Sequence, residues 1–402
     1  MPAEAKSRPP ADLLAARMQD PYPYFAWLRR HAPAHVERRP GRPAVWQISR
    51  YQDVRALLCD PRLSKDPGRV PGYMPGPSGL NRHLVHADPP DHTRLRTLVN
   101  SAFVPRRIAL LEPFIAEVAH RLMDRVEHQV HIDLIADFAA PLTFRMICAI
   151  LGVPEHLDTP GTRDTLMATI APDTIADPAR AGRDLHALLD ALIVGKRAGE
   201  ESGGVDLLGA LVRAGDESGA MSEEELRSTA YLLLLVGHDT TMNLIGNGML
   251  ALLRHPDQAA RLAGQDAGSS LLATAVEELL RYDSPVRDAT FRCAGESIRL
   301  HGQTIDAGEI VSLLIGSANR DEEHFTDPGR LDVGRTPNDH LAFGYGPHFC
   351  IGAALARLEG AVAFPLLLER LGTVELAKPA DELPWRPARV IRGLAALPLV
   401  RR

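Results

Sequence analysis

Residues 343–352 read Phe343-Gly344-Tyr345-Gly346-Pro347-His348-Phe349-Cys350-Ile351-Gly352 and lead directly into a run with helical spacing, AALARLEGAVAFPLLLERL. This order puts the thiol of Cys350 at the N-terminus of a helix, where unpaired backbone N–H groups and the positive end of the helix dipole favour the thiolate. A thiolate can bind a metal or act as a nucleophile. Gly344, Gly346 and Gly352 also allow the backbone to approach a flat ligand closely.

A single cysteine would more often be a small buried hydrophobe behind a turn, but the complete pattern around Cys350 argues for a ligand. The stretch resembles the haem-binding signature of the cytochrome P450 family, Phe-Gly-x-Gly-x-His-x-Cys-x-Gly, and matches it at every specified position. The resemblance implies that Cys350 is the axial thiolate ligand of haem b, iron protoporphyrin IX, in a loop that includes Phe343, Gly344 and Gly352. In that family the thiolate donates electron density through the iron and helps to cleave the O–O bond.

A long helix is predicted upstream, from Ser222 to about Arg254, ahead of Pro256. The Ser222 hydroxyl and the carboxylate of Glu225, three residues further on, have the spacing of a capping box. The middle of this helix carries Gly-His-Asp-Thr-Thr at 237–241, and burying such polar groups in an apolar segment is costly unless they have partners. An isolated Asp-Thr pair would usually be explained by threonine bonding to a carbonyl of its own helix.

The resemblance gives these polar residues a role in the reaction. It implies that Asp239 and Thr240 are the acid–alcohol pair that delivers protons to the distal oxygen, at a local distortion of the helix that makes room for O2. Val236 departs from the family, which more often has Ala or Gly at this position. We expect the larger side chain to crowd the distal pocket or to redirect the substrate, without changing the class of reaction.

Segments that resemble the lining of the distal pocket are spread along the chain and are mostly apolar. They are Asp66–Leu80, the region around Met167–Asp177, Leu233–Thr240, Pro285–Thr290 and the turn near Val390–Arg392, with Val236, Gly237, Val286 and Thr290 as single candidates. Asp66–Leu80 is so rich in Pro and Gly that we expect a long loop that covers the ligand. Such lining favours a bulky, largely nonpolar small molecule such as a polyketide or terpenoid, although many of these residues could simply pack the core.

Glu278 and Arg281 are three residues apart, on one face of a predicted helix. Alone, this spacing usually marks a surface ion pair. The later segment Phe325-Thr-Asp-Pro-Gly-Arg330 resembles the irregular stretch of the family whose arginine joins the Glu-Arg pair. We therefore predict a structural network of Glu278, Arg281 and Arg330.

Haem carries propionates, which need charge-assisted partners where they enter a low-dielectric interior. The family positions for such partners are matched by His92 and Arg96, by Arg292 and by His348. Each could instead be an ordinary surface cation, most readily Arg292. Arg94, between the first two, is expected to face outward as a solvated charge.

The resemblance extends from about Pro21 to the C-terminus. It implies a protein that is mainly α with a smaller β-containing region (α+β): the cytochrome P450 fold, a triangular prism with a long central helix crossing the haem. Residues 1–20 are predicted to be a tail and 21–402 a single catalytic domain. Strand-like runs indicate β-structure at about 21–65 and 284–320 and in a C-terminal hairpin, and helical spacing dominates about 91–283 and 350–371.

The chain has 402 residues, of which 45% are hydrophobic, and a net charge of −6, so no basic field favours nucleic acid or an anionic membrane. The N-terminus lacks the pattern of a secretory signal. The most apolar stretch, Ala230–Val236, is far shorter than the about 18 residues of a membrane span. The four dispersed cysteines fit a reducing cytoplasm better than a disulfide framework or a zinc site. We expect a cytoplasmic protein with no nucleic-acid or membrane partner.

The resemblance implies a monooxygenase that inserts one oxygen atom of O2 into a small molecule, by hydroxylation or epoxidation. The sequence has no dinucleotide fingerprint, and a haem domain of about 400 residues leaves no room for a fused flavin reductase. NAD(P)H would therefore supply electrons through a separate ferredoxin and ferredoxin reductase. Arg106, Arg107 and Arg357 are candidates for a basic docking face, and a monomer is expected.

Two other interpretations use the same signature. A peroxygenase would take its oxygen from peroxide and would typically lack the acid–alcohol pair. A non-catalytic relative that only activates a partner is disfavoured by the presence of Cys350, Asp239 and Thr240. Steady turnover with peroxide, but never with O2 and a reductant, would select the peroxygenase.

Overall fold

The computed structural model describes residues 8–73, 80–103, 105–154, 159–168, 177–199, 206–266 and 268–402. Its backbone divides into two units. The mixed unit contains Met1–Gly72, Ala119–Ala139 and Thr240–Arg402, and the helical unit contains Tyr73–Val118 and Ala140–Asp239. The chain passes from one unit to the other within α6 (Glu112–Val126) and within α11 (Glu223–Arg254).

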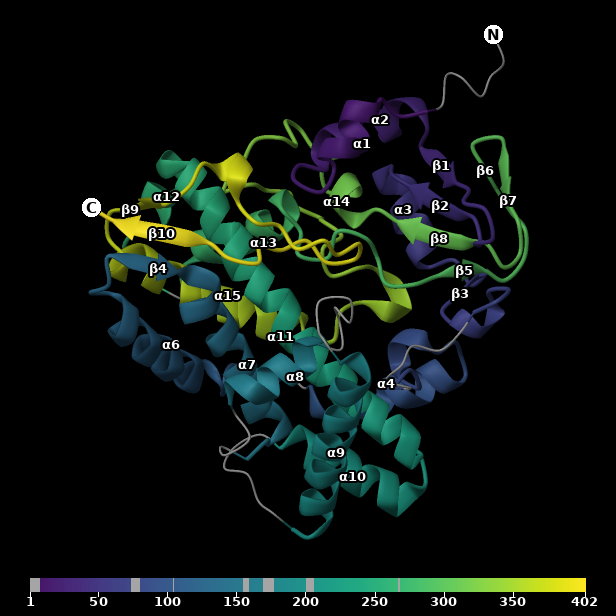
Figure 1. The fold of residues 1–402 in the computed structure, drawn as a ribbon, viewed down its shortest axis with the longest axis horizontal. Coiled ribbons are helices and arrows are strands. Elements are labelled where there is room, and N and C mark those ends of the chain that lie inside the picture. The colour runs from purple at the N-terminus through teal and green to yellow at the C-terminus, as the bar shows by residue number, and fades with distance from the viewer. Residues whose placement is uncertain are drawn as a thin grey trace. The chain divides into compact units, whose positions relative to one another are not determined.

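The helical unit is built from short and medium helices (Figure 1), and its described residues contain no strand. The helices that lie wholly within it are η3 (Leu84–His86), α4 (Asp91–Ala102), α5 (Pro105–Ala109), α7 (Ala140–Leu151), α8 (Pro160–Ala168), α9 (Pro178–Arg197) and α10 (Leu207–Ser218). Leu185, Leu189 and Leu192 recur at helical spacing and give α9 its buried face. Through this face α9 can pack against its neighbours, and it contacts both α8 and α10.

The predicted long helix is confirmed as α11. The predicted capping box closes its first turn: the Ser222 N–H donates to Glu225 Oε2 at 2.8 Å, and the Glu225 N–H donates to Ser222 Oγ at 3.3 Å. The helix ends at Arg254, just before Pro256 begins α12. Proline is favoured there, because the backbone N–H of the first residue of a helix has no acceptor within the helix.

The mixed unit holds all of the described strands together with several helices. Its helical elements are α1 (Ala11–Ala16), α2 (Tyr22–His31), α3 (Tyr51–Leu58), η2 (Pro67–Arg69), η4 (Ile135–Ala139), α12 (Pro256–Leu262), α13 (Ser270–Tyr282), α14 (Ile315–Ala318), η7 (Gly346–His348), α15 (Ala353–Arg370) and η8 (Ala380–Glu382). Its strands are β1 (Ala34–Glu37), β2 (Val45–Ile48), β3 (Leu63–Ser64), β4 (His131–Asp133), β5 (Cys293–Ala294), β6 (Ile298–Leu300), β7 (Gln303–Ile305), β8 (Ile310–Leu313), β9 (Val374–Leu376) and β10 (Pro398–Arg401).

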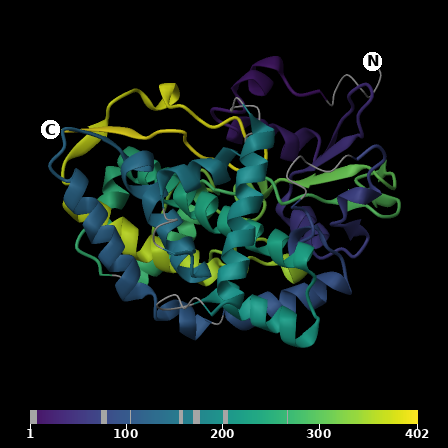
Figure 2. The same ribbon diagram turned by 60° about the horizontal axis from the view of Figure 1, so that its bottom comes forward.

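These strands form a five-stranded sheet in the order β1-β2-β8-β5-β3, a three-stranded sheet in the order β4-β10-β9 and the two-stranded β6-β7. In both ribbon views the purple strands β1 and β2 lie beside the green strand β8 (Figure 1 and Figure 2). The β2–β8 pairing is parallel, and the other pairings of the five-stranded sheet are antiparallel. The five-stranded sheet therefore joins strands from the two ends of the chain.

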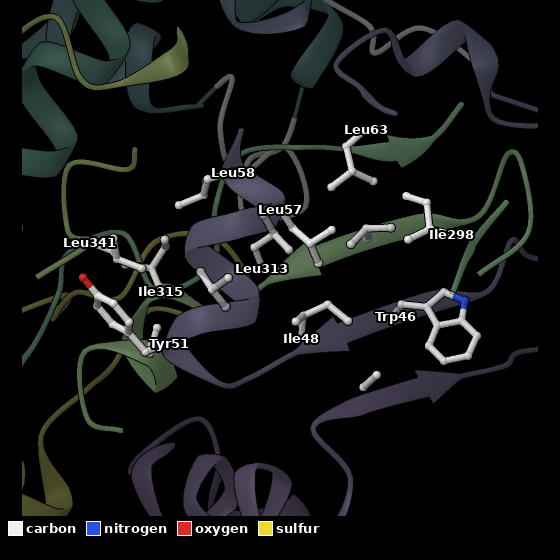
Figure 3. Close-up of a cluster of buried hydrophobic side chains, with 14 of the residues drawn as sticks. Trp46, Ile48, Tyr51, Leu57, Leu58, Leu63, Ile298, Leu313, Ile315 and Leu341 are labelled. Carbon is white, nitrogen blue, oxygen red and sulfur yellow. The ribbon is translucent and has the colours of Figure 1, made fainter. Parts of the chain in front are cut away.

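The helix α3 packs on the five-stranded sheet through a cluster of buried apolar side chains (Figure 3). Leu57 belongs to α3, while Trp46 and Ile48 come from β2 and Leu313 from β8. Each leucine or isoleucine that is fully buried stabilises the fold by about 1.5–3 kcal/mol. Trp46 Nε1 also donates to Glu309 Oε2 at 2.6 Å, so the indole buries its ring and keeps its hydrogen bond.

The predicted fold class, mainly α with a smaller β region, is confirmed. The strand-like runs are strands at Val45–Ile48, Ile298–Leu300 and Ile310–Leu313. The described part of Asp66–Leu80 is a loop with one 3-10 turn, at Pro67–Arg69. Residues 74–79 of that loop, and 169–176 of the region around Met167–Asp177, lie outside the described residues. None of the described helices is both long and apolar enough to cross a membrane.

Gly248 on α11 lets this helix approach α13 and α15 closely. A Cβ built on Gly248 lies 2.5 Å from Phe364 Cζ and 3.4 Å from Leu279 Cδ1, and the Phe364 side chain is 0% exposed. Because that ring is enclosed, we expect Gly248→Ala to cost about 1–3 kcal/mol of unfolding free energy, which outweighs a helix-propensity gain of about 1 kcal/mol. The variant should unfold at a lower temperature, as measured by circular dichroism.

Gly182 in α9 is the matched control, because no atom lies within 4 Å of a Cβ built there. Gly182→Ala should raise the unfolding temperature, since it gains helix propensity without a clash. An equal rise in both variants would show that α11 is not closely packed at Gly248.

Candidate active site

The loop that carries Cys350 is held by its own backbone. The Cys350 N–H donates to the Phe343 carbonyl at 2.9 Å. Gly344 and Gly346 have φ angles of 73° and 76°, in the left-handed region that favours glycine. The loop ends at Gly352, the N-cap of α15, so the exposed Cys350 thiol lies just before the N-terminus of this helix. This is the position at which a thiolate is favoured.

Phe343 is held by a charged cluster that the sequence did not indicate. Arg357 on α15 lies over the Phe343 ring, 4.5 Å from its centroid, and donates to both oxygens of Glu277 at 2.6 and 2.8 Å. His340 Nε2 lies 3.1 Å from the same carboxylate. Burial would raise the pKa of Glu277, but the hydrogen bonds with Arg357 and His340 hold it down at about 2. Arg357 therefore has a carboxylate partner within the fold.

Glu278 and Arg281 on α13 form an enclosed ion pair in which both side chains are 0% exposed. Arg281 Nε donates to Glu278 Oε2 at 2.7 Å, and Nη2 donates to Oε1 at 2.8 Å. The guanidinium also donates to the backbone carbonyls of Asn319, Pro328 and Arg330. The pair is thus an interior anchor with its hydrogen bonds satisfied, rather than a surface ion pair.

The arginine side chain that joins this pair is Arg335, not Arg330. Arg335 Nε lies 3.1 Å from Glu278 Oε1, whereas the Arg330 side chain is exposed and its carbonyl accepts from Arg281 at 3.2 Å. The chain turns at Asp327, which has a φ of 44° and a carbonyl that accepts the Arg330 N–H at 3.0 Å. This turn directs the Arg330 backbone, instead of its side chain, toward Arg281. The prediction of Arg330 is therefore wrong for the side chain.

Two of the predicted propionate partners lie in the mixed unit. Arg292 is 3% exposed, and its Nη1 donates to the Thr290 carbonyl at 2.8 Å. Burial lowers the pKa of Arg292 to about 10, and the Cys59 thiol opposes that shift. A buried guanidinium whose hydrogen-bond acceptor is a neutral carbonyl is suited to binding an anionic ligand. His348 is half-buried in η7, within the loop that carries Cys350.

The other two predicted partners, His92 and Arg96, lie one turn apart on one face of α4 in the helical unit. His92 is buried and Arg96 is half-buried. The prediction that Arg94 is a solvated charge is wrong. Arg94 donates to both oxygens of Glu225, at 2.5 and 3.2 Å, and to the Ala220 carbonyl, because the capping box presents that carboxylate to α4. The same bonds with Arg94 lower the pKa of Glu225.

The burial of α11 changes around the predicted acid–alcohol pair. Asp239 is buried and Thr240 is half-buried, while Val236, one turn before Thr240 on the same face, is 40% exposed. A Cβ on Gly237 would lie 2.6 Å from Ile147 Cδ1, so Gly237 serves close packing against α7. α11 is α-helical throughout its length, with no break near Asp239. The local distortion that the resemblance implies therefore stays a prediction.

The remaining pocket candidates lie in the mixed unit. Val286 is half-buried and forms a β-bridge with Ile391, which joins the segment Pro285–Thr290 to the turn near Val390–Arg392. Thr290 is exposed. These two predicted pocket segments are therefore neighbours in the fold.

The residues of the mixed unit fit the chemical needs of haem. Haem iron takes a thiolate ligand, and the exposed Cys350 thiol lies before a helix N-terminus. Haem also carries carboxylates, and Arg292 is a buried cation whose pKa is lowered by its burial. The exposed Cys350 sulfur is thus available for a metal, and the buried Arg292 guanidinium is suited to an anion.

The family model described as Cytochrome P450 matches residues 269–386. Cytochrome P450 monooxygenase PikC of Streptomyces venezuelae is 44% identical over 384 residues, which cover 94% of this chain and 91% of PikC. Polyketide biosynthesis cytochrome P450 PksS of Bacillus subtilis is 37% identical over 399 residues, which cover 94% of this chain and 95% of PksS. The solved structure of the tirandamycin C-bound P450 monooxygenase TamI matches with a TM-score of 0.87 and 41% identity, covering 96% of this chain and 98% of TamI.

We expect Arg335→Met to destabilise the protein and Arg330→Met to change its stability little. The Arg335 side chain is 12% exposed, and its loss removes a donor from the enclosed Glu278 carboxylate, at a cost of about 1–3 kcal/mol. The Arg330 side chain is exposed, so its change should stay within about 0.5 kcal/mol. The midpoint of urea unfolding, followed by circular dichroism, measures both. Equal losses, or a larger loss for Arg330→Met, would contradict the assignment of Arg335.

Proposed function

This chain belongs to the cytochrome P450 family, and we propose that it is a haem-thiolate monooxygenase that inserts one oxygen atom of O2 into a mostly apolar small molecule. The relatives that span most of the chain are P450 monooxygenases, and the expected P450 fold is confirmed by the match to TamI. The observation that carries the proposal is the Cys350 loop. It presents an exposed thiol ahead of α15, on a backbone already held by the Phe343 carbonyl.

The proposed cofactor is haem b, with its iron bound by the Cys350 sulfur. Haem, when bound, supplies the activation of O2. The N-terminus of α15 favours the thiolate that this ligand needs. The pKa of Arg357 is raised, mainly by its hydrogen bonds with Glu277 and to a smaller extent by the nearby Cys350 sulfur, so a positive charge lies close to the proposed ligand. There is open space beside Gly352, since no atom lies within 4 Å of a Cβ built there.

The proposed partners of the propionates are the cations that the family resemblance singles out. Arg292 and His348 belong to the mixed unit, and His92 and Arg96 belong to the helical unit. Arg292 has the strongest support, because it is 3% exposed and its burial lowers its pKa. A bound carboxylate would stabilise the charged form of such a group.

Asp239 and Thr240 are proposed to deliver protons. Asp239 is buried and the neighbouring Thr240 is half-buried, so an interior carboxyl is followed by a more exposed hydroxyl-bearing residue. The Asp239 carboxyl would hold the proton, and Thr240 Oγ1 would pass it on. Val236, one turn away on the face of Thr240, would keep water from this hydroxyl with its exposed isopropyl group.

The proposed substrate is a bulky, largely nonpolar secondary metabolite such as a polyketide or terpenoid. PksS is named for polyketide biosynthesis, and TamI was solved with tirandamycin C bound. Val236 and Thr240 give the accessible face of α11 one apolar and one hydroxyl group. Shape would then decide most of the selectivity, with few polar anchors.

Electrons are proposed to come from NAD(P)H through a ferredoxin reductase and a ferredoxin, with the protein acting as a cytoplasmic monomer. Of the candidate docking residues, Arg106 is exposed. The side chain of Arg107 lies outside the described residues. Arg357 forms an ion pair with Glu277, so its charge is already neutralised within this protein and is less suited to binding a ferredoxin. The docking role therefore rests on Arg106, and charge reversal there without effect on ferredoxin affinity would refute it.

Two alternatives remain distinct from this proposal. A peroxygenase would turn over steadily with peroxide and never with O2 and a reductant. A non-catalytic auxiliary protein would turn over with neither. Asp239 and Thr240 favour the monooxygenase, because the acid–alcohol pair has a purpose when O2 must be reduced with protons.

We expect the reduced wild-type protein under carbon monoxide to show the red-shifted absorption of thiolate ligation, and Cys350→Ser to lose it. A neutral hydroxyl cannot donate electron density to iron as a thiolate does. Cys59→Ser is the matched control, because Cys59 is also an exposed cysteine. A band that survives in Cys350→Ser, or that disappears in Cys59→Ser, would contradict the assignment.

Val236 is expected to select ligands by size. Val236→Ala should bind the bulkier members of a graded ligand series about tenfold more tightly, and Val236→Ile should shift the preference toward smaller members. The measurement is an optical titration that follows the low-spin to high-spin change of ferric iron. The same order of affinities in all three proteins would show that this side chain does not line the pocket.

A further inference from the structure

Two buried cations, Lys65 and Arg292, bind the same residue in the mixed unit, outside the loop that carries Cys350. The strands β3 and β5 pair antiparallel with Ser64 opposite Cys293, and their labels are adjacent in Figure 1. Lys65 directly follows Ser64, the last residue of β3, and Arg292 directly precedes Cys293, the first residue of β5. The two positive residues therefore lie at the same end of this strand pair.

Both cations contact Thr290, which lies two residues before Arg292 in the sequence. Lys65 Nζ donates to Thr290 Oγ1 at 2.6 Å, and Arg292 Nη1 donates to the Thr290 carbonyl at 2.8 Å. Lys65 and Arg292 are 2% and 3% exposed, whereas Thr290 is exposed. The cluster thus joins two buried charges to an exposed residue.

The direction of the Lys65–Thr290 hydrogen bond follows from the chemistry of its groups. An ammonium group has donors and no acceptor, so Thr290 Oγ1 must be the acceptor. The hydroxyl hydrogen of Thr290 can then be donated to a third group. A hydroxyl donor between two positive charges is complementary to a carboxylate.

The electrostatics of the pair point the same way. Lys65 and Arg292 both bond to Thr290, so two like charges are buried around one residue, and burial makes their mutual repulsion more costly. Burial lowers the pKa of Arg292 to about 10, and the group that opposes this shift is the Cys59 thiol rather than a carboxylate. An anion bound at this cluster would offset both the repulsion and the burial of the charge.

We propose that Lys65, Thr290 and Arg292 form a carboxylate-binding cluster in which Lys65 acts through the Thr290 hydroxyl. The proposal deepens the proposed function and rests on it, because Arg292 is already a proposed partner of a haem propionate. It adds Lys65 and assigns Thr290 to anion binding instead of substrate-pocket lining. The carboxylate is that of a haem propionate or that of a substrate, and the two measurements below distinguish these sources.

The first measurement is the rate at which the ferric holoprotein loses haem to excess apomyoglobin, followed by absorption. Lys65→Met keeps the unbranched stem without the charge, and Thr290→Val keeps the shape without the hydroxyl. We expect each variant to lose haem about tenfold faster, the effect of one hydrogen bond to a charged group. The double variant should be no faster than the faster single variant, since Lys65 acts through Thr290.

Two control variants separate the hydroxyl and the charge from other effects of substitution. Thr290→Ser retains the hydroxyl and should lose haem at the wild-type rate. Lys378→Met removes a lysine charge from an exposed position and should also leave the rate unchanged. Faster loss in both Lys65→Met and Lys378→Met by the same factor would mean that net charge, and not the cluster, governs haem retention, and would overturn the proposal.

The second measurement is an optical spin-state titration of the same proteins with myristic acid and with its chain-matched primary alcohol. Unchanged haem loss, with weaker binding of the acid but not of the alcohol in Lys65→Met and Thr290→Val, would identify the carboxylate as that of a substrate. No change in haem loss and no change in acid binding would overturn the proposal. Failure of the proposed function differs, because the wild-type protein would then lack the thiolate absorption band, whereas failure of the cluster alone leaves that band intact.

Discussion

The enclosed guanidinium of Arg281 sets the course of the chain that leads to Cys350. Because Arg281 is 0% exposed, its N–H groups need acceptors inside the protein, and besides Glu278 it uses the Asn319 carbonyl at 2.8 Å. The side chain of Asn319 in turn accepts the Leu341 N–H at 2.7 Å, directly ahead of the cysteine loop. One buried ion pair therefore helps to position the thiol, because hydrogen bonds connect Arg281 through Asn319 to the backbone ahead of the cysteine loop.

Features that depend only on residues adjacent in the sequence could be predicted. The capping box at Ser222 joins residues of one turn, and the loop around Cys350 is one continuous stretch with a specific pattern. The choice between Arg330 and Arg335 depends on how the chain turns between them, and composition does not reveal that turn. Lys65 gave no signal at all, because its neighbours are set by strand register with residues more than 200 positions away, such as its hydrogen-bond partner Thr290, for which the separation is 225.

The resemblance located charged residues better than it located their partners. Arg94 and Arg357 were expected to face solvent or another protein, and both bind carboxylates of this chain, Glu225 and Glu277. A long, flexible side chain can reach a partner on another element, and a sequence records the charge without the distance. Residue type therefore predicts what chemistry is present in this fold, while the arrangement of the elements decides which charges remain for ligands.

The glycines of α11 have a practical consequence for anyone who evolves this enzyme toward a new substrate. At Gly237 and Gly246, a Cβ would lie 2.6 Å from Ile147 Cδ1 and 2.5 Å from Ile135 Cδ1, so the neighbouring elements occupy the room that any larger residue would require. A library that randomises these two glycines would contain many destabilised members, because any larger residue must displace an isoleucine side chain. Diversity is better concentrated at accessible positions such as Val236, which is 40% exposed.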